Sequence, residues 1–146
     1  MKRKTIIILC ILVVIAVAGI YAYNEFNRKH PDMRAVSSAY YIDAIALVNE
    51  FEKDDSVASK KFLGKIITVE GTLKEINDAG NSITIVLGDT ASMSSVRCAM
   101  DTGFSLNTQS MIKGNALTVK GNCTGFNEDE LLGSDVVLNR CIVVKQ

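Results

Sequence analysis

The pattern of apolar and polar positions changes twice along the chain. Residues 5–23 form an unbroken apolar run that follows a basic cluster at residues 2–4. Such a run can span the hydrocarbon core of a bilayer as a helix, and basic residues on its short side favour a cytoplasmic N-terminus. We therefore expect residues 1–23 to be a single anchor in the cytoplasmic (inner) membrane, with the C-terminal domain extracytoplasmic. A cleaved signal peptide is the alternative.

A polar linker and a helical segment come next. Residues 24–42 are polar and contain Pro31, the only proline of the chain, as expected of a linker. Between residues 43 and 63, apolar side chains recur at helical spacing, but Asp55 falls on the same face. We therefore expect two short helices. The expected boundary residues, which are N-caps and a helix stop, are Asp43, Asp54 or Asp55, and Gly64.

From residue 65 onward the apolar period becomes two, which is typical of half-buried strands. Turn signals separate five such segments, with one longer irregular gap over residues 101–115. Five short strands with this spacing predict a small closed or partly open barrel, which leaves no exposed sheet edge. The predicted fold class is all-β (β-barrel) with an added helix: one domain of residues 43–146, with a helical segment at 43–63 and a barrel at 65–146.

Two of the predicted strands carry nearly the same sequence. ITVEGTLKE at residues 67–75 returns as LTVKGNCTG at residues 117–125. The repeat is too short to be a domain, so we expect one geometry imposed on two strands. In both, a glycine (Gly71 and Gly121) stands where a side chain would point inward, which allows a bulge or a sharp bend around a small barrel.

A series of short motifs between Asn27 and Val144 also has a familiar order: NRKHPDM, ASKKFLGK, IITVEGTL, KGNALTVKGNCTG and DVVLNRCIVV. In these motifs the chain resembles the tRNA_anti-like family, an OB-fold family of small exported or membrane-anchored bacterial proteins. The resemblance implies a five-stranded OB barrel preceded by a helical segment. The family name implies binding of nucleic acid, but by fold kinship alone, which is an analogy and not a mechanism.

OB folds usually bind oligomers on the outer face of the second and third strands, where aromatic rings and cations hold a single strand. The outward positions expected here are Ser82, Thr84 and Val86, then Ser95, Arg97 and Ala99. None is aromatic, and one is a cation. Three of the sixteen Lys and Arg residues lie before residue 5, whereas all sixteen Asp and Glu residues follow residue 23. Residues 24–146 therefore carry a formal charge of −3. This charge disfavours nucleic acid.

A small, uncharged strand face better suits a glycan or an envelope protein. The candidate ligand-binding residues are Arg97, Thr84, Ser95 and Val86, with the arginine as polar anchor; alternatively, this arginine is an ordinary solvated surface residue. No catalytic motif and no spacing typical of a metal or cofactor site occurs. We therefore expect a non-enzymatic binding or interaction module without a cofactor, and single-stranded or tRNA-like nucleic-acid binding is the alternative.

Three cysteines fall within the predicted barrel, and an exported domain favours a disulfide between two of them. If the last two strands form a hairpin, Cys123 and Cys141 oppose each other and come within bridging distance. In an OB barrel the last strand also lies beside the third, so Cys98–Cys141 is an alternative pair. A third alternative is three reduced, buried cysteines, since sequence alone does not fix connectivity.

Overall fold

The computed structural model describes residues 3–26, 33–80, 82–101, 111–129, 131 and 133–145. The chain divides into two compact units, Met1–Pro31 and Asp32–Gln146. The first unit contains helix α1 (Arg3–Phe26), whose side-chain surroundings are described for residues 11–23. Within the described part of the chain no helix has both the length and the apolar character needed to cross a membrane.

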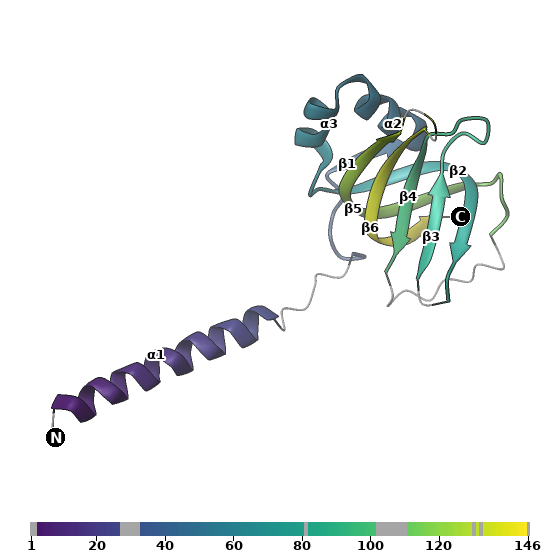
Figure 1. The fold of residues 1–146 in the computed structure, drawn as a ribbon. Coiled ribbons are helices and arrows are strands. Elements are labelled where there is room, and N and C mark those ends of the chain that lie inside the picture. The colour runs from purple at the N-terminus through teal and green to yellow at the C-terminus, as the bar shows by residue number, and fades with distance from the viewer. Residues whose placement is uncertain are drawn as a thin grey trace. The chain divides into compact units, whose positions relative to one another are not determined.

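The second unit is built on a five-stranded barrel. Its strands are β2 (Ile66–Asp78), β3 (Ile83–Leu87), β4 (Ser95–Met100), β5 (Ala116–Asp129) and β6 (Gly133–Lys145). The order is β2-β3-β4-β6-β5, and pairing between β2 and β5 closes it; β4 and β6 run parallel and the other barrel pairs are antiparallel (Figure 1). This is the predicted OB-type barrel. The expected irregular segment at 101–115 falls largely outside the described residues.

The chain before the helices is also attached to the barrel. Strand β1 (Tyr40–Asp43) pairs in parallel with the first half of β2 and adds a sixth strand beside the barrel. The Lys120 ammonium donates hydrogen bonds to the carbonyl oxygens of Arg34 (3.4 Å) and Val36 (3.0 Å). The structure therefore places the second half of the expected linker, from residue 33 onward, within the compact unit.

Two helices follow β1, as the break in the apolar pattern predicted. They are α2 (Ala44–Lys53) and α3 (Asp55–Phe62). The Asp43 carboxylate caps α2 by accepting hydrogen bonds from the backbone N–H groups of residues 45 and 46, and Asp54 caps α3 by accepting one from residue 57. Gly64 follows α3 with a φ of 72°, a left-handed conformation that favours glycine at a helix end. The predicted caps and stop are confirmed.

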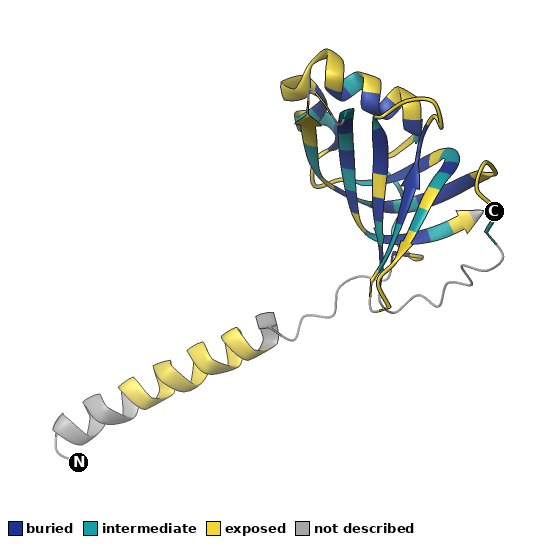
Figure 2. Ribbon diagram, turned by 45° about the vertical axis from the view of Figure 1, so that its right-hand side comes forward, coloured by how far each residue is buried: buried dark blue, intermediate teal, exposed yellow. Residues whose placement is uncertain are grey.

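The helices lie over one end of the barrel (Figure 1). Aromatic side chains connect them to it. Phe51 of α2 is 1% exposed; its ring stacks on Phe126 of β5 at a centroid distance of 4.9 Å and lies 5.9 Å from the ring of Phe62. Figure 2 shows that burial runs along the strands and along the helix faces turned toward them. The helices and the barrel therefore share one core.

The two similar segments prove to be direct neighbours. They pair in antiparallel fashion about Val69 and Val119, so that Gly71 lies opposite Leu117 and Gly121 lies opposite Ile67. Both glycines face inward, as expected: a Cβ on the first would meet Ala44 of α2, and one on the second would meet the sulfur of Cys141. The repeat thus reflects close packing at two related positions; a bulge occurs only at the second glycine.

Candidate functional site

The outer face of β3 and β4, defined by Thr84, Val86, Ser95 and Arg97 and called here the strand face, is less open than expected. Arg97 is exposed and Thr84 is partly exposed, whereas Val86 and Ser95 are only 5% and 3% exposed. Val86 pairs across strands with both Arg97 and Glu75, whose long side chains flank it. The structure therefore leaves two of the four predicted ligand-binding residues accessible.

The cation on the strand face already has a partner. Arg97 Nε donates to Asp135 Oδ2 at 2.6 Å, and the other carboxylate oxygen accepts a hydrogen bond from the hydroxyl of Ser95. Asp135 belongs to β6, which pairs with β4 across about forty residues of sequence. Sequence spacing gave no sign of this partner, because parallel pairing between distant strands is set by barrel closure. The pair makes this part of the face electrically neutral.

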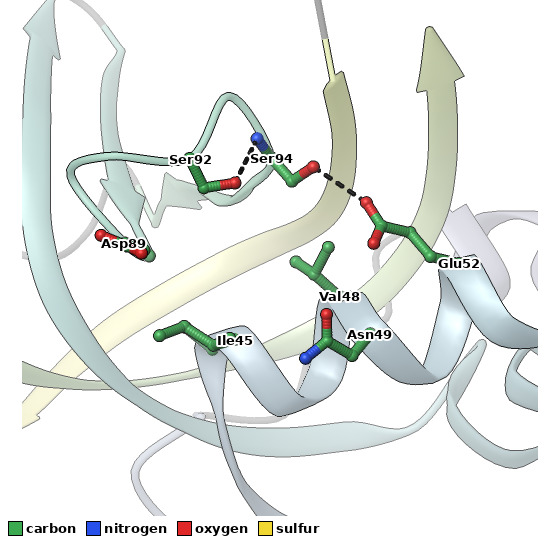
Figure 3. A pocket seen from close by; sticks show the side chains of 9 residues that line it. Ile45, Val48, Asn49, Glu52, Asp89, Ser92 and Ser94 are labelled. Atoms are coloured by element: carbon green, nitrogen blue, oxygen red, sulfur yellow. Dashed lines mark hydrogen bonds between the residues drawn. The ribbon is translucent and has the colours of Figure 1, made fainter. Parts of the chain in front are cut away.

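A second candidate site is a pocket of about 220 Å³ between α2 and the loop joining β3 to β4. Its lining combines an apolar floor with polar walls: Ala44, Ile45, Val48, Asn49 and Glu52 from the helix, and Gly88, Asp89, Ser92 and Ser94 from the loop. Figure 3 shows Asp89 and Glu52 at opposite sides of the pocket, with the helix below and the serines above. The sequence analysis did not identify this site, although its helix residues recur at three- and four-residue spacing on one face.

Hydrogen bonds fix the loop side of the pocket. The hydroxyl of Ser94 donates to Glu52 Oε1 at 2.8 Å, and its backbone N–H donates to the hydroxyl of Ser92 at 3.1 Å. The Lys74 ammonium donates hydrogen bonds to the carbonyl oxygens of Ser92 (2.7 Å) and Ser94 (3.2 Å). The backbone N–H of Ser134 donates to the Ser94 hydroxyl. The loop is therefore tied to α2, β2 and β6.

The three barrel cysteines are free and buried. The expected opposition of Cys123 and Cys141 is wrong: Cys123 pairs with Leu138, while Cys141 pairs with Met100 of β4. Bulges on either side of Asn122 and Cys123 shift the register of the β5–β6 hairpin, so counting from its turn fails. Instead the thiol of Cys141 lies near that of Cys98, the alternative pair.

Burial makes the thiols of Cys123 and Cys141 poor nucleophiles. It raises the pKa of Cys123 from near 9 to about 11. It also raises the pKa of Cys141 well above the usual range, with a smaller contribution from neighbouring Cys98. Because the thiolate is the reactive form, this arrangement disfavours thiol chemistry.

We expect the stability of the domain to fall between pH 9 and 11. In this window the Cys123 thiol of the unfolded chain loses its proton, whereas that of the folded chain keeps it, so ionisation favours the unfolded state. Urea unfolding at several pH values measures the effect. Cys123→Ala should have a flatter stability profile than the parent across this window. Equal slopes for the two chains would contradict the assignment.

Comparison with known proteins identifies the family of this chain. The model of the tRNA_anti-like family matches residues 1–142. The chain belongs to the tRNA_anti-like family. Among solved structures, a candidate nucleic acid-binding lipoprotein from Klebsiella pneumoniae is 20% identical, with a TM-score of 0.55, and the match covers 80% of this chain and 100% of that one. Comparison with curated proteins gave no match.

Aminoacyl-tRNA synthetases are also similar in part to this tRNA_anti-like chain. A candidate aspartyl-tRNA synthetase from Leishmania major is 9% identical, with a TM-score of 0.45, covering 82% of this chain and 22% of that one. Asparaginyl-tRNA synthetase from Pyrococcus horikoshii is 14% identical, with a TM-score of 0.40, covering 58% and 21%. At such identities the Klebsiella structure supports the OB fold and no more.

Proposed function

We propose that this chain is a non-enzymatic binding module whose OB barrel binds an envelope protein or a glycan. The observation that carries the proposal is the ion pair between Arg97 and Asp135 on the strand face. Sequence-tolerant binding of single-stranded nucleic acid uses a cationic groove together with stacked aromatic rings. A cation that is already neutralised within the fold contributes little to such a groove.

The neighbours of Arg97 strengthen this argument. Val86 and Val137 lie on either side of it across the strands, and Glu75 lies beyond the first valine. When Asp135, the partner of Arg97, is counted with this row, the surface offers small apolar groups and two carboxylates to one cation, a net charge of −1. Such a surface repels a polyphosphate and suits contacts with an uncharged or weakly charged partner.

We place the compact unit outside the cytoplasm. The support for this placement comes from sequence alone: the basic cluster at residues 2–4 and the apolar run at residues 5–23, acting as an anchor or an export segment. Alkaline phosphatase fused after residue 30 should be active in a bacterial host. An inactive fusion, with an active fusion to a cytoplasmic reporter, would overturn the placement.

Nucleic-acid binding is the second candidate function. It is favoured by the family name and by the Klebsiella lipoprotein, which is described as a candidate nucleic acid-binding protein. In this function Arg97 would have to exchange Asp135 for a phosphate. That exchange has a measurable cost, because a carboxylate left partly buried without its partner is destabilising.

A titration of the isotope-labelled full chain with single-stranded RNA and DNA separates the two functions. We expect the amide signals of the strand face to stay unmoved at low salt, and peptidoglycan fragments or envelope proteins to move them. Asp135→Asn is the matched variant, because it releases Arg97 and should strengthen any phosphate contact. Shifts at the strand face of the parent chain that fade with salt would establish the nucleic-acid function instead.

A further inference from the structure

The pocket between α2 and the β3–β4 loop is lined by two carboxylates, whose oxygen atoms accept hydrogen bonds. Glu52 uses one carboxylate oxygen to accept from Ser94, and Asp89 uses one to accept from the backbone of Ala91 at 2.9 Å. Among the described residues, the second oxygen of each has no hydrogen bond. The lining contains no lysine or arginine. The open acceptors therefore favour a ligand that carries donors and positive charge.

The helix side of the same pocket is apolar. Val48 and Ala44 are buried beneath it, and Ile45 is 48% exposed at its side. A group that fits must therefore combine a cationic end with an apolar stem. Lysine and arginine side chains have this construction, since they pack their methylene groups on apolar surface while the charged end reaches polar partners.

The walls of the pocket are held in place before any ligand arrives. Gly88 opens the loop with a φ of 147°, which a side chain would strain, and Lys74 binds the loop carbonyls from the β2 side. The start of β6 packs on the loop, because a Cβ on Gly133 would meet the backbone of Met93. A preformed site loses less entropy on binding.

We propose that this pocket receives a lysine or arginine side chain of a partner polypeptide. The cationic group lies between the carboxylates of Glu52 and Asp89, and the stem packs on the apolar floor. The volume of about 220 Å³ exceeds the roughly 150 Å³ that holds a benzene molecule in a protein core, so one such side chain fits. The pocket shares no lining residue with the strand face, and the inference does not depend on the function proposed above.

Two probes that differ only in charge test the proposal. N-acetyl-lysine methylamide and N-acetyl-norleucine methylamide are titrated into the labelled full chain. We expect the lysine probe to shift amide signals of residues 88–94 and of α2, and the norleucine probe to leave them in place. Glu52→Gln and Asp89→Asn should each weaken the lysine probe about threefold to fivefold, as for other exposed ion pairs.

Asp78→Asn is the matched control. Asp78 accepts a hydrogen bond from the backbone of Gly80 at 2.8 Å, in the same turn geometry as Asp89, but at the other end of β3. Loss of the Asp78 carboxylate should leave the affinity for the lysine probe unchanged. Equal shifts with both probes, or equal losses in all three variants, would overturn the proposal. Tighter binding of glucosamine than of the lysine probe would also overturn it, in favour of an amino sugar.

Discussion

Phe51→Ala should lower the free energy of unfolding by about 3–5 kcal/mol, the cost expected when a large buried aromatic side chain is truncated. The Phe51 ring is 1% exposed and joins helix α2 to the barrel through Phe126 and to α3 through Phe62. Its removal leaves a cavity where the helices meet the barrel. Urea unfolding of the full chain, followed by circular dichroism, measures the change.

Val57→Ala is the control for this prediction. Val57 lies on the outer side of α3, is 59% exposed, and also loses methyl groups. Surface substitutions of this kind usually change stability by less than about 0.5 kcal/mol. A cost for Phe51→Ala close to that of Val57→Ala would mean that the helices contribute little to the core.

Gly121→Ala should destabilise the domain by about 1–3 kcal/mol, the usual cost of forcing an extra methyl group into a packed core. The added Cβ would collide with the sulfur of Cys141 and press on Leu138 and on the carbonyl oxygen of Asn139, each 3.4 Å away. The backbone there is not left-handed, so crowding and not strain explains the cost. Urea unfolding gives the magnitude.

Gly125→Ala, four residues along the same strand, is the matched control. Its added Cβ would meet nothing within 4 Å, so we expect little change in stability. A second test joins Gly121→Ala with Cys141→Ala, which removes the colliding sulfur. The double variant should lose less than the sum of the two single changes. Strict additivity would show that the sulfur is not the cause.

The sequence predicted local features of this fold well and distant ones poorly. The helix break at Asp54, its caps and the alternation of the strands depend on residues a few positions apart, and all are present in the structure. The attachment of β1 to β2 was missed, because the four residues of β1 are too few to show the alternation that predicts a strand. The cysteine pairing failed because hairpin bulges change the register without a signal in the pattern.

The candidate sites show the same division. Strand phase placed Arg97 on the outer face correctly, but the burial of Ser95 depends on Asp135, which barrel closure brings alongside. The pocket is formed by one face of α2 and by a loop about forty residues later in the sequence. These two segments come together only because the helix packs over the end of the barrel. No spacing rule within either segment contains that information.

The free thiols of the barrel also bear on how the folded domain meets thiol reagents. Cys98, Cys123 and Cys141 are buried and contribute small apolar groups to the core. A reagent can therefore reach them only when the barrel opens. The rate at which each of these three thiols is alkylated reports how often the folded domain opens.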